Sequence, residues 1–235
     1  MIVLNAKKFL YCAIDYKEIE EAERLLCIIS HAIGGIKLGL EFFISNGING
    51  VNRLKKFNLP IFLDLKLHDI PNTVSEAINA ALIAKPDFIS VHINGGTEML
   101  KIISKKEETK IIGVSMLTSL DERDLVSLGI NISIPDYVKR LVKLASECDL
   151  EGVVCSPNEL KMLREIYPKD FVLITPGIRL ENSKKNDDQK RISSPGDAIK
   201  NGSDILIIGR PITRSKDPLF AIQNIQDDII KKSKR

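Results

Sequence analysis

The sequence predicts an α/β fold, a single (β/α)8 TIM barrel over residues 1–235. Short runs rich in Val, Ile and Leu recur along the chain, and segments with apolar residues at helical spacing lie between them. Near-continuous apolar strands that alternate with helices are typical of a parallel sheet covered by helices. Eight such units within about 250 residues favour a closed barrel over an open, doubly wound sheet.

Eight strands are predicted, in this order: Phe9–Asp15, Gly35–Leu40, Ile61–Leu67, Phe88–Ile93, Lys110–Leu117, Gly152–Ser156, Phe171–Gly177 and Ile205–Arg210. Helical spacing is clearest in two sets of apolar residues, namely Ile19, Ala22, Leu25, Leu26 and Ile29, and Tyr137, Val138, Leu141, Leu144 and Ala145. Pro71 opens a helix predicted over Asn72–Ala84, and Pro157 opens another, because Pro suits the first helical turn.

One domain is the economical interpretation, because the chain contains no linker, low-complexity tract or shift in composition. The longest stretch without periodicity is Ile178–Ser194, whose length fits a lid or binding loop as well as a plain surface loop. Four of its basic residues are predicted to be solvated: Lys184, Lys185, Lys190 and Arg191. A basic tail at about 231–235 is predicted to be frayed and solvated, with Lys231, Lys232, Lys234 and Arg235.

The composition excludes several classes of protein. With 44% hydrophobic and 28% charged residues, the chain is typical of a globular protein. A net charge of +3, without a basic stripe, predicts no nucleic-acid partner. No apolar run reaches about 18 residues and no signal peptide precedes the first strand, so no membrane association is predicted. Four scattered cysteines, Cys12, Cys27, Cys148 and Cys155, indicate reduced thiols in a cytoplasmic protein and no zinc site.

Charged residues fall where the first three strands end, which is where barrel enzymes place their active sites. Strand one ends at Asp15, strand two carries Lys37, and strand three carries Asp64 and Lys66. Side chains alternate along a strand, so Asp64 and Lys66 share a face with Phe62. The opposite face carries Leu63, Leu65 and Leu67. Because the leucines must pack against helices, Asp64 and Lys66 are expected to point into the barrel mouth. Lys37, flanked by two apolar residues, is expected to point the same way, so that the four charges converge there.

A functional role for these four charges is favoured over a structural one. Desolvation costs several kcal/mol per ion, so a buried ion pair rarely stabilises a fold more than an apolar pair does. The two nearby histidines are interpreted as structural. His68 is expected to face the helix layer or a subunit contact. For His92, near the end of strand four, an inward orientation stays open. Neither has a nucleophile partner that would complete a catalytic triad.

The last two strands end in residues suited to an anion. Barrels often hold a phosphate beside the loops after strands seven and eight. Gly209 lets a backbone N–H approach an anion closely, and the guanidinium of Arg210 matches phosphate oxygens. Arg179 and Gln189 lie at the root of, or within, the long polar loop that follows strand seven. The sequence therefore predicts a small phosphorylated substrate.

The residues at the end of strand three carry a known pattern. Asp64-x-Lys66-x-x-Asp69, followed by Ile70-Pro71-Asn72-Thr73, resembles the signature of the orotidine 5′-phosphate decarboxylase family. Matching elements elsewhere end at or contain Asp15, Lys37, Thr118, Arg179, Gln189 and Arg210. The first pattern alone is shared by a wider suprafamily, whereas the combination is specific. One departure is Asn186-Asp187-Asp188, which stands where a glycine is expected before Gln189.

The resemblance implies loss of CO2 from C6 of orotidine 5′-phosphate to give UMP, the last step of de novo pyrimidine biosynthesis, without metal, flavin or other cofactor. By this likeness Lys66 stabilises a vinyl carbanion at C6 and then donates the proton. Asp64 and Asp69 crowd the departing carboxylate, and Lys37 bridges Asp64 to the ribose. Asp15 binds a ribose hydroxyl.

The resemblance also assigns the remaining contacts. Thr73 binds the ribose, and Thr118 belongs to the element that reads the pyrimidine. The phosphate is held by Gln189, Gly209 and Arg210, and by Arg179. In the family the residues at the positions of Asp69 and Thr73 come from the neighbouring subunit, which implies a homodimer with two shared sites.

Two alternatives stay open at this point. A keto-gulonate 6-phosphate decarboxylase or hexulose-phosphate synthase resembles this pattern but needs Mg²⁺, held partly by an acidic residue on strand two. Lys37 takes that position here and would repel the metal. The other alternative is a non-catalytic barrel that binds phosphate or a nucleotide. A binder would gain little from carboxylates placed beside an anionic ligand.

Overall fold

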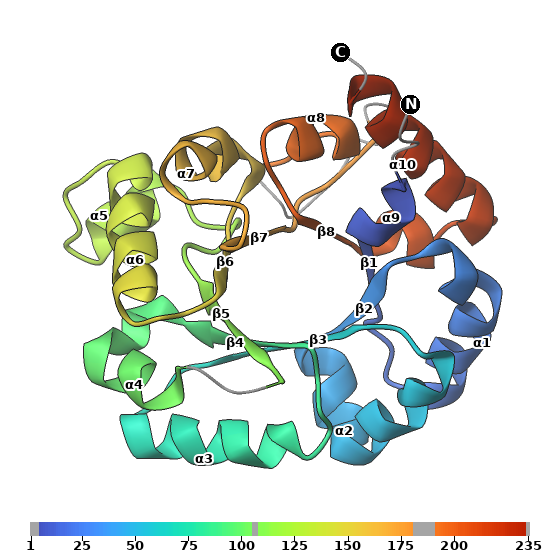
Figure 1. Ribbon diagram of the computed structural model, residues 1–235, viewed down its shortest axis with the longest axis horizontal. Coiled ribbons are helices and arrows are strands. Elements are labelled where there is room, and N and C mark those ends of the chain that lie inside the picture. Colours follow the sequence, from blue (N-terminus) through green and yellow to red (C-terminus); the bar gives the residue numbers. More distant parts are fainter. Residues whose placement is uncertain (1–4, 105–107, 181–190, 234–235) are drawn as a thin grey trace.

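The architecture is a closed barrel of eight parallel strands in sequence order, as the sequence predicts. The structure is a computed structural model that describes residues 5–104, 108–180 and 191–233. Its strands are β1 (Leu10–Ala13), β2 (Gly35–Leu38), β3 (Ile61–Leu67), β4 (Phe88–His92), β5 (Lys110–Val114), β6 (Gly152–Val154), β7 (Val172–Thr175) and β8 (Ile205–Ile208). Figure 1 shows the ring of strands with helices around its outside.

The helices follow the strands and form the outer layer. They are α1 (Ile19–Ile29), α2 (Leu40–Leu54), α3 (Pro71–Leu82), α4 (Gly96–Ile103), α5 (Glu122–Ser127), α6 (Ile134–Glu147), α7 (Leu160–Ile166), α8 (Pro195–Lys200), α9 (Arg210–Thr213) and α10 (Pro218–Ser233). Short 3-10 turns are η1 (Ala6–Phe9), η2 (Ser30–Ala32), η3 (Lys55–Phe57), η4 (Ile93–Gly95) and η5 (Pro157–Glu159). Pro71 opens α3 and Pro157 opens η5, which leads into α7, so both proline signals are confirmed.

All eight predicted strands exist, but most end earlier than predicted. β1 ends at Ala13 instead of Asp15, and β5 ends at Val114 instead of Leu117. Arg210, predicted as the end of a strand, is the first residue of α9. Apolar runs continue past the last ladder hydrogen bonds because the first residues after a strand, such as Ile14 and Met116, are still buried. Asp15 and Leu117, the ends that the sequence predicted, are exposed.

Two cores follow from the alternation of side chains along the strands. The outer core lies between strands and helices and includes Leu63 of β3 and Ile78 of α3, both fully buried. The inner core fills the barrel with Tyr11, Phe62, Ile112, Ile174 and Ile205. The rings of Tyr11 and Phe62 each meet Phe88 edge-on, with centroids 6.2 Å apart. Phe62 thus points inward and Leu63 outward, as predicted for β3.

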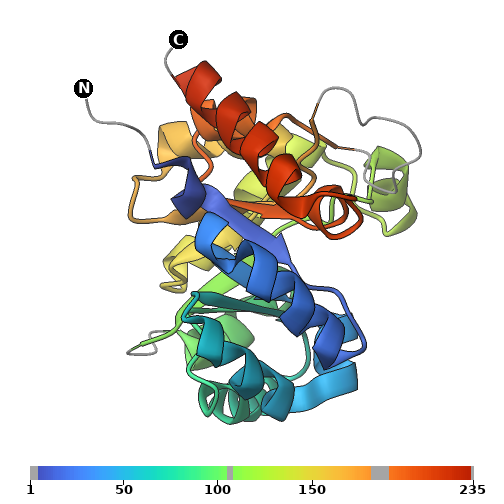
Figure 2. The same ribbon diagram turned by 90° about the vertical axis from the view of Figure 1, so that its right-hand side faces the viewer.

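The last helix, α10, packs over the outside of the barrel beside η1, α1 and α8 (Figure 2). Lys232 near its end donates to the side chains of Asp197 and Ser194, each at 2.7 Å. The predicted frayed tail is therefore wrong at Lys232, because acidic and hydroxyl groups of α8 and its cap hold the ammonium. Within the described ranges no helix combines the length and apolarity needed to cross a bilayer.

Candidate active site

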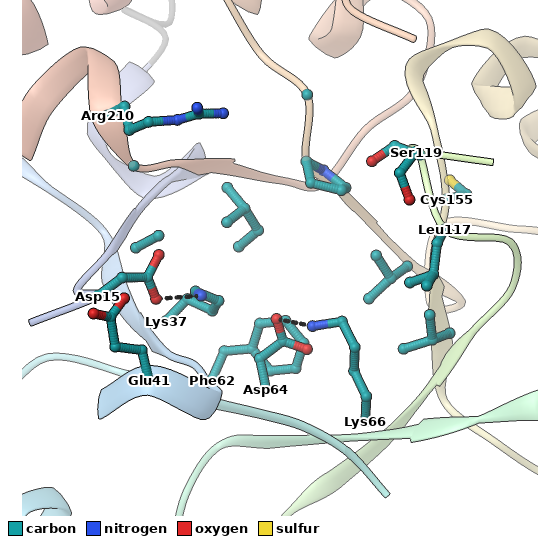
Figure 3. Close-up of a pocket in the computed structure, with 18 of the residues that line it drawn as sticks. Asp15, Lys37, Glu41, Phe62, Asp64, Lys66, Leu117, Ser119, Cys155 and Arg210 are labelled. Carbon is teal, nitrogen blue, oxygen red and sulfur yellow. Dashed lines mark hydrogen bonds and ion pairs between the residues drawn. The ribbon is translucent and has the colours of Figure 1, made fainter. Parts of the chain in front are cut away.

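A cavity of about 510 Å³ opens at the carboxyl ends of the strands. Its floor is apolar and includes Phe62, Val154 and Ile207, which belong to or pack against the inner core. Its polar lining includes Asp15, Lys37, Glu41, Asp64, Lys66, Thr118, Ser119, Arg179, Arg210, Thr213 and Arg214. Figure 3 shows Asp15, Lys37, Asp64 and Lys66 around one space, with Arg210 on the opposite side from Lys66.

The four charges predicted to meet in the mouth form two short ion pairs. Lys37 Nζ donates to Asp15 Oδ1 at 2.8 Å, and Lys66 Nζ donates to Asp64 Oδ2 at 2.7 Å. These residues come from β1, β2 and β3 or the turns after them, and the three strands are neighbours in the barrel. Gly39 permits the first pair, because a Cβ there would lie 2.5 Å from Lys37 Nζ. The predicted convergence is confirmed.

The Asp64 carboxylate is buried, with the residue only 8% exposed. Burial is the largest single influence on its pKa and raises it. The charges of Lys66 and Lys37, with hydrogen bonds from Lys66 and Ser90, together outweigh burial and hold the pKa of Asp64 below its usual range. The site therefore keeps this acid ionised at neutral pH.

The backbone at Lys66 is unusual. Lys66 has a φ of +51°, in the left-handed region that side chains other than Gly and Asn rarely adopt. The pairing of β3 with β4 shifts here: Leu63 lies opposite Ile89, whereas Leu67 lies opposite Val91. An advance of four residues along β3 thus corresponds to an advance of two residues along β4. Strain of this kind persists only when surrounding contacts over-determine it, and it concentrates at functional sites.

The predicted phosphate end is assembled from β7 and β8. Gly209, Arg210 and Arg179 all line the cavity. A Cβ on Gly209 would lie 3.3 Å from the Cβ of Ala13, tighter than ordinary contact. The root of the long loop is closed by a hydrogen bond from Arg179 N to Ser193 O at 2.9 Å. Gln189, predicted to hold the phosphate, lies outside the described residues.

Arg191, at the other end of the long loop, corrects a prediction. It was expected to be solvated with its basic neighbours, but it is 9% exposed and forms an ion pair with the buried Glu159. Its Nη2 also donates to Leu117 O at 2.9 Å, directly before Thr118 in the cavity wall. Burial raises the pKa of Glu159, partly opposed by Arg191 and by hydrogen bonds from Ser156 and Arg191. Arg191 thus fixes the end of the loop to Glu159 and to the segment that contains Thr118, which is predicted to read the pyrimidine.

Two predicted site residues do not line the cavity of this chain. Asp69 and Thr73 are exposed, just after β3 and in the first turn of α3. Asp69 Oδ1 accepts a hydrogen bond from the Ile70 backbone at 2.7 Å.

The two histidines lie together near the same edge of the barrel. His68 is exposed, and its ring centroid is 5.6 Å from that of His92. Burial, His68 and Lys66 lower the pKa of His92 below its ordinary value, against the opposing effect of Asp64. Neither ring lines the cavity as described.

The sequence interpretation missed several residues of this site. Glu41 and Arg214 line the cavity, each a few residues beyond a strand whose end was already assigned. Ser90, on β4, donates a hydrogen bond from its Oγ to Asp64 Oδ1 at 2.8 Å. For Ser90 a signal existed, since alternation along β4 places it on the inward face between Phe88 and His92.

A closed barrel whose mouth alternates acidic and basic groups, with arginines at one end, is typical of a barrel enzyme and suits a small anionic ligand. Comparison with known proteins identifies the family. The sequence model of the Orotidine 5′-phosphate decarboxylase / HUMPS family matches residues 8–225. The chain belongs to this family.

Individual relatives agree along nearly the whole length. The orotidine 5′-phosphate decarboxylase of Sphingopyxis alaskensis is 46% identical over 220 residues, covering 92% of this chain and 97% of that protein. The one from the Wolbachia of Brugia malayi is 44% identical over 210 residues, covering 88% and 92%. The crystal structure of orotidine 5′-phosphate decarboxylase from Lactobacillus acidophilus has a TM-score of 0.79 and 31% identity, covering 94% of this chain and 98% of that one.

Proposed function

We propose that this chain decarboxylates orotidine 5′-phosphate to UMP in pyrimidine biosynthesis. Family membership and the names of relatives at up to 46% identity support the reaction. The observation that carries the proposal is the alternating row of Asp15, Lys37, Asp64 and Lys66 in one cavity, with Arg210 across from Lys66 (Figure 3). This layout suits a substrate with a phosphate at one end and a carboxylate at the other.

Lys66 is the proposed catalytic group. When the bond between C6 and the carboxylate breaks, its electron pair stays on C6 and CO2 leaves. The Lys66 ammonium, held at 2.7 Å by Asp64, is already oriented when negative charge develops on C6. Lys66 Nζ then gives a proton to C6, completing UMP, and the resulting amine regains a proton from water. The proposal requires no metal or organic cofactor.

The carboxylates act on the ground state. Asp64 is ionised in the free site, so it repels a substrate carboxylate placed beside it. That repulsion disappears when the carboxylate departs as neutral CO2. Asp69 is proposed to add a second negative charge, and Lys37 to link the acidic groups to the ribose.

The remaining residues are proposed to bind the nucleotide. Asp15 and Thr73 bind ribose hydroxyls, and Thr118 contacts the pyrimidine. Four residues hold the phosphate: Arg179, Gln189, Gly209 and Arg210. Binding energy from the phosphate can serve catalysis when it orients the ring and excludes water from the reacting carbon.

We also propose a homodimer whose two sites are shared. Asp69 and Thr73 are exposed and stand outside the cavity of their own chain, so a contribution to catalysis requires another copy. Ile70 between them is 66% exposed, which gives this edge an apolar side chain suited to burial in an interface.

A spectrophotometric assay tests the function. Mixing the protein with orotidine 5′-phosphate should remove the ultraviolet absorbance of the orotate ring, at the same rate with and without excess EDTA. An unchanged spectrum would refute decarboxylation and favour a binding protein. Decay that strictly requires added Mg²⁺ would favour the metal-dependent relatives, which the ammonium of Lys37 beside Asp15 argues against.

A further inference from the structure

Ser90 connects the two central residues of the site from a position that the nucleotide need not touch. It lies on β4 and is fully buried. Its Oγ donates to Asp64 Oδ1 at 2.8 Å and accepts from the backbone N–H of Lys66, also at 2.8 Å. Since Lys66 Nζ holds the other oxygen of the same carboxylate, the hydroxyl closes a ring of hydrogen bonds.

The position of this hydroxyl matches the irregularity of β3. Lys66 has left-handed backbone geometry where four steps of β3 oppose two of β4. Ser90 lies on β4 between the two residues that pair across this shift, Ile89 and Val91. The Lys66 N–H inside the bulge is therefore satisfied by a side chain, and the strained conformation gains a hydrogen-bond partner.

We infer that Ser90 is a positioning residue, whose hydroxyl locks the Asp64 carboxylate and the Lys66 backbone to each other and so keeps the Lys66 ammonium aimed at the reacting carbon. The inference deepens the proposed function and rests on it for the reaction that is served. Ser90 acts through Asp64 and Lys66.

Only a group that donates and accepts at once can fill this role, which suits a hydroxyl. Alanine would leave Asp64 Oδ1 and the Lys66 N–H without this shared partner in a buried place. The Lys66 segment would then relax from its left-handed geometry, moving the ammonium. The hydrogen bond from Ser90 lowers the pKa of Asp64. Removing that hydrogen bond would therefore raise the pKa of Asp64.

The experiment compares Ser90→Ala with Ser203→Ala, a matched control. Ser203 is also buried and hydrogen-bonds Thr175 Oγ1 at 2.8 Å, but it does not belong to the cavity lining. For Ser90→Ala we expect kcat to fall by about 10²-fold, the cost typical of an ångström-scale misplacement. KM should stay close to wild type, and the acidic limb of the kcat profile should move to higher pH.

For Ser203→Ala, kcat and the pH profile should match wild type even if thermal stability falls. Ser90→Thr, which restores the hydroxyl, should recover much of the loss in kcat. Equal kcat values and superimposable pH profiles for the two alanine variants would overturn the inference, as would a threonine variant no better than alanine when both are folded.

A second readout separates this inference from the proposed function. In ¹³C NMR titrations of the carboxyl groups, with the Asp64 signal assigned by its absence in Asp64→Asn, Ser90→Ala should raise the pKa of Asp64 and Ser203→Ala should leave it unchanged. This measurement needs no turnover. An unshifted Asp64 in Ser90→Ala overturns the inference whether or not the wild-type protein decarboxylates its substrate, whereas inactivity of wild type refutes the function alone.

Discussion

Replacing Arg191 by methionine removes one half of a buried ion pair while keeping much of the side-chain volume. Arg191 is 9% exposed and Glu159 only 4%. Without the guanidinium, the Glu159 carboxyl keeps hydrogen bonds within its capping turn, such as the one from Ser156 N at 2.7 Å, but loses its compensating charge. The carbonyl of Leu117 loses a donor at the same time.

Breaking a buried pair by removing one partner costs about 3–5 kcal/mol. For a chain of this size, 1 kcal/mol corresponds to about 2–4 °C, so the Tm should fall by about 6–20 °C. The control is Arg53→Met, because Arg53 is half-exposed and bridges Glu20 and Glu23 on the surface. Exposed pairs of this kind contribute little to stability, because water screens both charges.

The assay is thermal unfolding followed by circular dichroism across a range of pH. The folded-state pKa of Glu159 is already raised by burial, and losing Arg191 removes a group that lowers it. Folding then favours the protonated acid, so Arg191→Met should regain stability relative to wild type as pH falls from neutral toward the ordinary pKa of Glu. Adding Glu159→Gln should restore stability at neutral pH. Equal losses in the Arg191 and Arg53 variants, or a loss independent of pH, would refute this reasoning.

Three further outcomes follow from the site. Lys66→Ala should lower turnover by several orders of magnitude with an unchanged circular dichroism spectrum, because the side chain is partly exposed and its loss leaves the cores intact. Arg210→Ala should weaken UMP binding by about 10- to 100-fold in calorimetry and leave uridine binding unchanged, because a charge-assisted contact contributes about 1.5–3 kcal/mol. Mixing inactive Lys66→Ala and Asp69→Ala proteins should restore activity, because a hybrid dimer contains one site with both residues.

For each of these predictions, a different result would refute the reasoning. Near-normal turnover in Lys66→Ala would remove Lys66 from its proposed role. Equal losses for UMP and uridine in Arg210→Ala would mean that the arginine does not contact the phosphate. No recovery in the mixture, with subunit exchange proven by mass spectrometry, would count against a shared site and against the proposed role of Asp69.

The barrel and the inward charges could be predicted because both depend on local patterns. Apolar runs and helical spacing identify eight repeating units, and a period of two places Asp64 and Lys66 with Phe62 on the inward face. The ion pairs of Lys37 with Asp15 and of Lys66 with Asp64 then follow from the adjacency of β1, β2 and β3. Strand order in a barrel of this kind needs no information beyond the sequence order.

The supporting residues could not be predicted in the same way. Arg191 looks solvated beside other basic residues, and its partner Glu159 lies 32 positions away on another loop. That pairing depends on the tertiary arrangement, which brings η5 beside the residues that precede α8. Ser90 sits in an apolar run, and its role depends on the shift in pairing between β3 and β4. Alternation predicts the direction of Lys66 but not its left-handed backbone.

The aromatic floor of the cavity bears on how the substrate enters and how the products leave. Tyr11, Phe62 and Phe88 pack together across the inside of the barrel, and the cavity lies on the carboxyl-terminal side of this packed layer. In the proposed reaction CO2 is released beside Asp64, and the phosphate lies across the cavity on the side of Arg210. Both products of the proposed reaction would then leave past the residues that hold the phosphate, so release of that group should influence the departure of CO2 as well as of UMP.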